Sequence, residues 1–218
     1  MKIAIIGLGF VGLSLTSVLA SKGYNIVGID IDREKCDKIS NGISPFFEPK
    51  LEKVLKNGLK KNLKISNKYS LINNCDFIFV TVGTPQNVNG SINLSIIKKA
   101  ISTIGENLQK SKKKPIIFIK STIIPGTIKK VILPILEKKS NKKEGKDFGL
   151  ISNPEFLQES SAIIDTKFPH VVVLGGNQTE FMKKAKKLFT KLHPNVPIIN
   201  TNHQTAEMIK YANNSFLA

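Results

Sequence analysis

Three glycines near the start of the chain have the spacing of a phosphate-binding turn. A mostly apolar run, residues 2–6, leads into Gly7-Leu-Gly-Phe-Val-Gly12, and an apolar helical pattern follows at once. In such a G-x-G-x-x-G turn the glycines permit a tight turn, a close approach of a pyrophosphate and close packing of the helix on the strand. The N–H groups and partial positive charge of the helix N-terminus favour phosphate there. The residues expected to contact a dinucleotide are Gly7, Gly9, Phe10, Val11 and Gly12.

An acidic residue follows this turn at the distance that a ribose-binding carboxylate requires. A second short apolar run, residues 25–29, ends in Asp30, close to the roughly 20 residues expected between the glycines and the acid that binds the ribose hydroxyls. Because a carboxylate repels a 2′-phosphate, the sequence favours NAD over NADP. Arg33 and Lys35 follow closely. They either soften this preference or form an ordinary solvated helix start.

Hydroxyl groups follow two further apolar strands. Thr84 comes after the run 77–80, and Thr122 comes after the run 116–119. Ligands bind outside the carboxyl ends of parallel strands, so we expect Thr84 near the dinucleotide and Thr122 near a nicotinamide or a catalytic water. A plain strand-to-loop turn at Thr84 and a helix-capping turn at Thr122 are the alternatives.

Two acids stand four residues apart in the segment Asn153-Pro-Glu-Phe-Leu-Gln-Glu159. Asn153 is typical of a helix N-cap and Pro154 of a first helical residue. This pattern predicts a helix with Glu155 and Glu159 on one face, where paired carboxyl groups suit general acid–base chemistry. The alternative is an acidic first turn that only complements the helix dipole.

A third cluster lies in the last stretch of the chain. Glu207, Lys210 and Asn214 have the spacing that places them on one face of a helix. An ammonium group and an amide on one face can together stabilise a developing oxyanion. A surface helix with a routine Glu–Lys pair is the alternative interpretation.

Alternating strands and helices must position these side chains. Apolar runs bounded by turn residues predict an α/β fold with a doubly wound, mostly parallel sheet and helices on both faces. Helical periodicity in residues 201–218 ends without a Gly or Pro stop signal, which suggests that the helix continues in a parent protein. Pro134 lies awkwardly within an expected helix and is expected to kink or end it. The expected strands are 2–6, 25–29, 63–65, 76–81, 115–120, 148–152, 171–175 and 197–200. The expected helices are 11–22, 32–41, 48–58, 93–110, 126–138 and 178–191, with 201–218 at the end.

Composition narrows the class of protein. The 218 residues carry a formal net charge of +17, which could indicate a nucleic-acid partner. However, nearly all of this charge is lysine spread along the chain, with Arg33 the one arginine, whereas arginine is the usual choice for bidentate phosphate and base contacts. We therefore expect a solvated surface and no nucleic-acid partner.

Cys36 and Cys75 give neither a metal-binding spacing nor a disulfide framework, so no metal is expected. The absence of a long apolar run and of a leader-like start favours a cytoplasmic protein without a membrane partner.

Taken in order, these motifs resemble those of a known family. The glycine turn, Val82–Pro85, Ser121–Gly126, Asn153–Glu159 and Ala206–Tyr211 together resemble the N-terminal part of the UDP-glucose/GDP-mannose dehydrogenase family. Within it they are most similar to the enzymes that oxidise UDP-glucose. The resemblance implies the reaction UDP-glucose + 2 NAD + water → UDP-glucuronate + 2 NADH. In such enzymes a cysteine holds the intermediate as a thiohemiacetal and then as a thioester.

The resemblance also implies roles for individual residues. Glu155 would be the acid–base residue, and Thr122 would position the hydrolytic water and contact NAD. Lys210 and Asn214 would bind the substrate and stabilise the oxyanion. The adenosine ribose would be bound by Asp30 and Lys35, and Glu159 would lie against the cofactor together with Thr84. The sugar pocket would be lined by Glu155, Phe156, Leu157, Gln158 and Glu159.

One feature of the family is missing from these residues. Its nucleophilic cysteine lies in a Gly-rich loop beyond residue 218, and neither Cys36 nor Cys75 has that setting. We therefore expect a truncated chain with an NAD-binding domain at 1–200, the start of a central dimerisation helix at 201–218, and no C-terminal substrate domain. It should bind NAD without turning over UDP-glucose, and the parent should be a homodimer. An apolar stripe would be left uncovered at Met208, Tyr211, Phe216 and Leu217.

Two other interpretations stay open. GDP-mannose 6-dehydrogenases share the Asn-Pro-Glu-Phe-Leu motif and the Ala-Glu-Met-Ile-Lys-Tyr helix, whereas the UDP-N-acetylmannosamine enzymes fit less well. A non-catalytic NAD-binding module would leave the paired Glu155 and Glu159, and the helix face with Lys210 and Asn214, without a purpose. In that case Glu155→Gln in the intact parent would leave activity unchanged.

Overall fold

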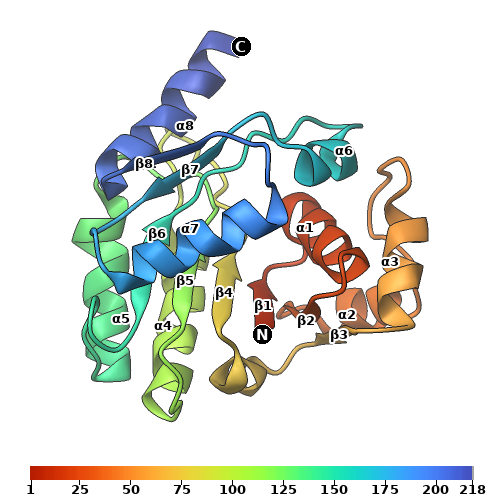
Figure 1. The fold of residues 1–218 in the computed structure, drawn as a ribbon, viewed down its shortest axis with the longest axis horizontal. Helices are drawn as coiled ribbons and strands as arrows, with labels where there is room; N and C mark the ends of the chain where they lie inside the picture. Colours follow the sequence, from red (N-terminus) through yellow and green to blue (C-terminus); the bar gives the residue numbers. More distant parts are fainter. Residues whose placement is uncertain (218) are drawn as a thin grey trace.

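An eight-stranded sheet forms the centre of the computed structural model, which describes residues 1–217, with the side chain of residue 217 excluded. The strands lie in the order β3-β2-β1-β4-β5-β6-β7-β8, with helices on both faces (Figure 1). Their bounds are β1 (Lys2–Ile6), β2 (Asn25–Ile29), β3 (Leu63–Ser66), β4 (Phe77–Val80), β5 (Ile116–Ile119), β6 (Gly149–Ser152), β7 (Val172–Gly175) and β8 (Ile198–Thr201). All eight strands expected from the sequence are therefore confirmed.

The helices follow the predicted alternation with a few differences. The α-helices are α1 (Phe10–Ser21), α2 (Arg33–Ser40), α3 (Leu51–Leu59), α4 (Ser95–Gln109), α5 (Leu133–Ser140), α6 (Ala162–Lys167), α7 (Glu180–Leu192) and α8 (His203–Leu217). A 3-10 helix, η1 (Tyr69–Asn74), and a π-helical turn, η2 (Ile128–Ile132), complete the described elements. Neither η1 nor α6 was expected, because both are short and have little periodicity of their own.

The strand directions make the sheet mostly parallel, as predicted. Strands β1 to β6 run parallel to their neighbours. Strand β7 is antiparallel to β6 through the pair Ser152 and Gly175, and β8 runs parallel to β7. The carboxyl ends of β1, β2, β4, β5 and β6 therefore lie along the same edge, where every sequence motif with possible chemistry begins except the one on α8.

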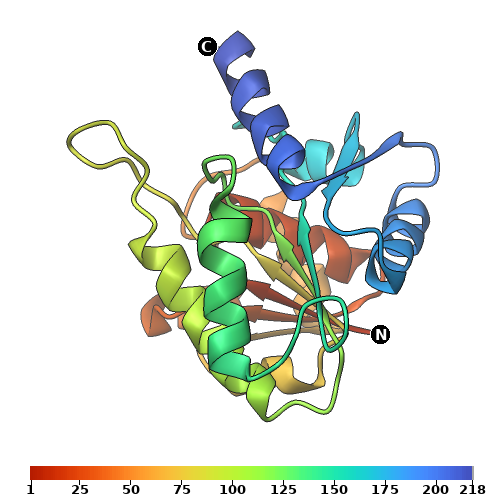
Figure 2. The same ribbon diagram turned by 90° about the vertical axis from the view of Figure 1, so that its left-hand side faces the viewer.

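Alternate side chains of the strands fill two separate cores. Ile3 and Ile5 of β1 pack with the helices α1, α3, α6 and α7. Ala4 and Ile6 point to the opposite face and pack with α4, α5 and η1. Figure 2 shows α4 and α5 covering this second face, while α8 projects away from the sheet. Because the central strands are buried on both faces, their sequences are almost wholly apolar.

The predicted helix at Asn153–Glu159 is wrong. Residues 153–158 have no regular structure, and the next helix, α6, begins at Ala162. The Asn153 side chain cannot act as an N-cap because it is buried and donates to the Val173 carbonyl at 2.9 Å. Glu155 and Glu159 therefore do not share a helical face, and Glu159 is exposed.

Pro134 does not end its helix; it lies just after the point where a π-helical turn passes into an α-helix. The π-helical turn η2 ends at Ile132, and Pro134 then occupies the first turn of α5. Proline has no N–H to donate to the preceding turn, and a wider π-helical turn accommodates that break. Among the described residues, no helix combines the length and the apolar character needed to cross a membrane.

Candidate functional site

The glycine turn between β1 and α1 combines a filled side and an open side. Gly7 has a φ of +94°, which favours glycine, and a Cβ at Gly12 would lie 1.8 Å from the Gly7 carbonyl oxygen. At Gly9 an added Cβ would meet no described atom within 4 Å. Gly9 is also the N-cap of α1, and no described side chain caps its N–H groups. The helix N-terminus is therefore open for an anionic group, as a pyrophosphate site requires.

A groove of about 600 Å³ runs beside this turn. Gly7, Gly9 and Asp30 line it together with Lys35. The Asp30 carboxylate is buried, and it accepts hydrogen bonds from Leu8 N at 2.8 Å and from Lys35 Nζ at 3.0 Å. The Asp30 carboxylate therefore lines the groove and also holds the glycine turn in place through its hydrogen bond with the Leu8 N–H. Arg33 is exposed, whereas the Lys35 ammonium group is tied to the carboxylate.

The loops after β4 and β5 are joined by their hydroxyl groups. Thr84 Oγ1 donates to the carbonyl oxygen of Thr122 at 2.7 Å. Ser121 Oγ donates to the Val82 carbonyl at 2.6 Å. The structure thus brings Thr84 and Thr122 together, as the strand order requires. The two hydrogen bonds hold the two loops in register at the edge of the sheet.

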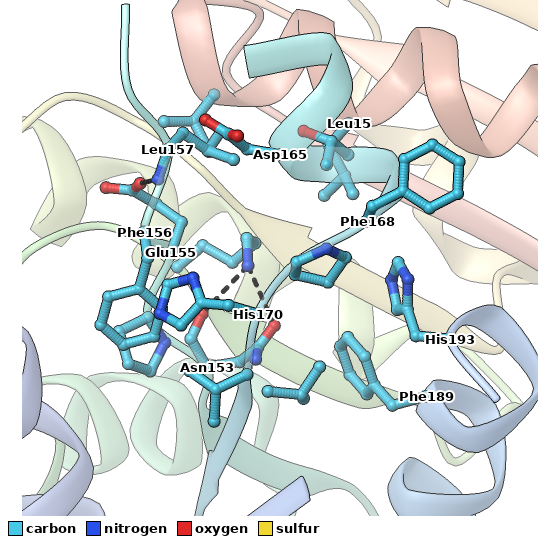
Figure 3. Close-up of a pocket in the computed structure, with 17 residues that line it drawn as sticks. Leu15, Asn153, Glu155, Phe156, Leu157, Asp165, Phe168, His170, Phe189 and His193 are labelled. Atoms are coloured by element: carbon cyan, nitrogen blue, oxygen red, sulfur yellow. Dashed lines mark hydrogen bonds between the residues drawn. The ribbon is translucent and has the colours of Figure 1, made fainter. Parts of the chain in front are cut away.

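A second cavity, of about 210 Å³, lies where β5 and β6 end (Figure 3). Its lining includes Val11 of α1, so both cavities adjoin the start of that helix. Of the residues assigned from the sequence, Glu155, Phe156 and Leu157 also line it. Gln158 and Glu159 are exposed and do not. Glu159 stays a predicted cofactor contact that this geometry does not bring to the cavity.

Glu155 and Lys210 form an ion pair across the fold. Lys210 Nζ lies 2.9 Å from Glu155 Oε1, with the two side chains only 8% and 13% exposed respectively. Figure 3 shows Glu155 turned back toward Leu157, whose N–H donates to Glu155 Oε2 at 2.7 Å. The same ammonium group lies 5.6 Å from the centroid of the Phe156 ring, a cation–π distance. Residues more than fifty positions apart are thus joined in one site.

The rest of the predicted α8 cluster divides into two roles. Glu207 does not pair with Lys210: it is buried and accepts hydrogen bonds from the N–H groups of Gly126 and Ile128, the latter at 2.9 Å. Burial raises the pKa of Glu207, while these hydrogen bonds act against the rise. Asn214 is exposed one turn beyond Lys210 and does not line the cavity. Its role in binding a substrate stays a prediction.

Lys120 was missed as a site residue. Its ammonium group lies in the second cavity and donates to Asn153 Oδ1 at 3.1 Å and to the Asn153 carbonyl at 3.3 Å. Burial lowers its pKa to about 8, against an opposing effect of the Glu155 charge. In a chain so rich in lysine nothing in its residue type is distinctive. Its position directly after an apolar strand was the available signal.

Histidines also line this cavity without having been singled out. His170 packs on the Phe156 ring with a centroid distance of 5.4 Å. His193, just after α7, also lines it. Burial and the nearby Lys22 charge lower the pKa of His193 to about 4. It is therefore a neutral ring at physiological pH.

The two cysteines do not have the properties of nucleophiles. Cys36 and Cys75 are free and buried. Burial raises the pKa of both thiols, to about 11 for Cys75. Since the thiolate is the reactive form, neither residue is suited to hold a reaction intermediate.

The apolar stripe expected on α8 is partly present, since Met208 and Phe216 are exposed, whereas Tyr211 is half-buried. The side chain of Leu217 lies outside the described residues.

Comparisons with known proteins agree with this geometry. The model of the UDP-glucose/GDP-mannose dehydrogenase family, NAD binding domain, matches residues 1–193. A GDP-mannose 6-dehydrogenase of Pseudomonas syringae pv. tomato is 40% identical over 218 residues, which cover 98% of this chain and 49% of that protein. The UDP-glucose 6-dehydrogenase AglM of Haloferax volcanii is 34% identical over 221 residues, covering 100% of this chain and 51% of that one.

A solved structure shows the same fold. The ternary complex of GDP-mannose dehydrogenase from Pseudomonas aeruginosa aligns with a TM-score of 0.94 at 35% identity, over 99% of this chain and 50% of that chain. This chain spans about half the length of the curated relatives that it matches. An open glycine turn, an acid at the end of β2 and a family match over most of the sequence lead to one conclusion. The chain belongs to the UDP-glucose/GDP-mannose dehydrogenase family and contains its NAD-binding domain.

Proposed function

We propose that this chain is the NAD-binding part of an enzyme that oxidises the primary alcohol of a nucleotide sugar, UDP-glucose, to a carboxylate. The observation that carries the proposal is the Glu155–Lys210 ion pair at 2.9 Å, beside a cavity that adjoins the glycine turn. A partly buried carboxylate and a buried ammonium group at one edge of the sheet form an acid–base pair next to a cofactor groove. A plain NAD-binding module has no need of that pair.

The residues present fit NAD. The open position at Gly9 and the uncapped start of α1 would accommodate the pyrophosphate. Asp30 and Lys35 would bind the adenosine ribose, and Thr84 and Thr122 would hold the nicotinamide end. When bound, the nicotinamide ring supplies the chemistry of hydride acceptance. Because three N–H or ammonium groups already bond the Asp30 carboxylate, ribose hydroxyls would compete chiefly with Lys35 for its oxygens.

The chain's own residues would move and stabilise charge. The Glu155 carboxylate would take the proton of a substrate hydroxyl or of a water that Thr122 positions. The Lys210 ammonium group, already held in place by Glu155 and Phe156, would stabilise the oxygen on which negative charge develops. Such preorganised charges need little rearrangement during the reaction. Asn214 would bind the substrate from the next turn of α8.

GDP-mannose is the second candidate substrate. It is favoured by the higher identity to the GDP-mannose enzyme of Pseudomonas syringae, 40% against 34% for the UDP-glucose enzyme of Haloferax volcanii.

We further propose that residues 1–200 form the NAD-binding domain and that α8 begins a central helix through which two copies of the parent associate. A cytoplasmic location completes this proposal.

Calorimetric titration of the chain with NAD and NADP tests the cofactor site. We expect NAD to bind at least about tenfold more tightly, because the Asp30 carboxylate repels a 2′-phosphate. Asp30→Asn removes that repulsion and should narrow the difference. Equal affinities for the two cofactors in the wild type would contradict the proposed role of Asp30.

The substrate is tested on the intact parent protein, which would carry the C-terminal substrate domain, by saturation-transfer NMR with UDP-glucose and GDP-mannose in the presence of NADH. A stronger transfer to UDP-glucose is expected, and a stronger transfer to GDP-mannose would reverse the order of the two candidates. In a separate assay of the 218-residue chain with NAD in place of NADH, the absorbance at the NADH band should stay flat with either sugar, because the described residues hold no reactive cysteine. A steady rise in that absorbance would refute this part of the proposal.

A further inference from the structure

We infer that Lys120 is a positioning residue of this site: its ammonium group holds Asn153, and through Asn153 the Glu155 carboxylate, at the carboxyl edge of β5 and β6. This inference rests on the proposed function, because Glu155 is the group being positioned. Lys120 itself follows β5 directly, and Asn153 follows β6 directly. The two dashed lines that end on Asn153 in Figure 3 mark this contact.

Asn153 is held from three sides. Its N–H donates to the Ile119 carbonyl of β5, and its side-chain amide donates to the Val173 carbonyl of β7, each at 2.9 Å. Lys120 Nζ then occupies both remaining acceptors, Asn153 Oδ1 and the Asn153 carbonyl oxygen, at 3.1 and 3.3 Å. Every polar group of Asn153 is therefore engaged. Residues 153–158 form no helix that could fix their position. The anchored Asn153 therefore determines where the backbone of Glu155, two residues further on, lies.

The surroundings of Lys120 indicate that its charge does not serve to stabilise the fold. Most lysines of this chain are exposed, whereas Lys120 is partly buried and forms no ion pair within 4 Å among residues 1–217. Taking an ammonium group out of water is costly. An apolar side chain of similar length would avoid that cost and still fill the space. What it could not do is donate to the two oxygens of Asn153.

The charged and titratable groups around Lys120 come from several elements. Glu155 lies on the loop after β6, Lys210 on α8 and His193 after α7, and Asp165 and His170 line the same cavity. Burial and the Lys210 charge lower the pKa of Lys120, to about 8, while the Glu155 charge acts in the opposite direction. The ammonium form therefore predominates at pH 7 and is lost as the pH rises through about 8. A neutral amine donates weaker hydrogen bonds than an ammonium group.

Hydrogen–deuterium exchange on the 218-residue chain tests this inference. In Lys120→Met we expect the hydrogen-bonded amides of Asn153 and Leu157 to exchange about tenfold faster, because a charge-assisted hydrogen bond to the segment is lost. Lys120→Arg should restore most of the protection, since its guanidinium group can reach the same oxygens. Lys142→Met is the matched control, because Lys142 is also partly buried and donates to a backbone carbonyl, that of Ser111, at 2.6 Å.

The pH profile separates positioning by charge from simple packing. The wild-type protection of the Asn153 and Leu157 amides, corrected for the intrinsic exchange rate, should fall between pH 7 and pH 9. In Lys120→Arg it should stay level, because arginine remains charged. Wild-type protection in Lys120→Met, or equal loosening in Lys142→Met, would overturn the inference. A parallel NAD titration distinguishes failure of this inference from failure of the proposed function. If the chain does not bind NAD, the proposed function is contradicted, whereas the anchoring of Asn153 by Lys120 is not.

Discussion

Replacing Gly9 by alanine should separate cofactor binding from folding. A Cβ at Gly9 meets no described atom within 4 Å, and the residue has an extended backbone, with φ −78° and ψ −162°. An added methyl group therefore needs no movement of the protein. Alanine gains about 0.4–1 kcal/mol through the unfolded state but loses a similar amount as a poorer N-cap than glycine. We expect the thermal midpoint to stay within about 4 °C of the wild type.

The same methyl group would occupy the space in which a pyrophosphate has to approach the start of α1. Displacing the phosphate from one backbone N–H loses a hydrogen bond to a charged group, about 1.5–3 kcal/mol. That loss corresponds to an affinity for NAD reduced roughly 10- to 150-fold. Isothermal titration calorimetry of the wild type and Gly9→Ala, with thermal unfolding of both, measures the two effects separately.

Gly12→Ala provides the contrasting control. Its Cβ would lie 1.8 Å from the Gly7 carbonyl oxygen and 2.6 Å from Thr81 Oγ1. Because a backbone atom cannot move aside as a side chain can, we expect about 3 kcal/mol or more of destabilisation, at or above the upper end of overpacking costs. If Gly9→Ala binds NAD like the wild type, or if it loses stability as Gly12→Ala does, the assignment of this turn to the pyrophosphate is wrong.

Two further predictions concern buried charge. Burial lowers the pKa of His193 to about 4, from 6.5 for an unperturbed histidine. Above pH 6.5 the ring is neutral in both the folded and the unfolded chain, and its burial costs no stability. As the pH falls from about 6.5 toward 4, the unfolded chain binds a proton that the folded chain does not, and the free energy of unfolding decreases. Urea unfolding at pH 7 and pH 5 should show roughly 1 kcal/mol of this loss, after allowance for partial exposure, and His193→Gln should remove it; an unchanged pH dependence in that variant would contradict the assignment. Lys210→Met should destabilise the fold by about 2–4 kcal/mol because it leaves the Glu155 carboxylate buried without its partner, and Lys210→Met combined with Glu155→Gln should recover part of the loss in a double-mutant cycle. Additive losses would show that the 2.9 Å pair contributes no coupling.

The sequence alone determined the order of elements and the cofactor site. Strand and helix periodicities are local properties, so the eight strands and the helices α1 to α5, α7 and α8 could be predicted from them. The glycine turn and the place of Asp30 beside it could also be predicted, because they depend on backbone geometry within one strand–turn–helix unit and the strand that follows it. Parallel strands then oblige the residues after β4 and β5 to meet, which explains why Thr84 and Thr122 lie together.

Only the tertiary structure decided which groups meet across that edge. Asn153 carries a strong local signal for a helix start, but hydrogen bonds to β5, β7 and Lys120 outweigh that local preference and leave the segment without regular structure. The same packing places Lys210 on Glu155 and sends Glu207 to the backbone of residues 126–128. Local spacing predicted neither outcome, because a buried charge takes the partner that the fold brings within reach, however far away that partner lies in the sequence.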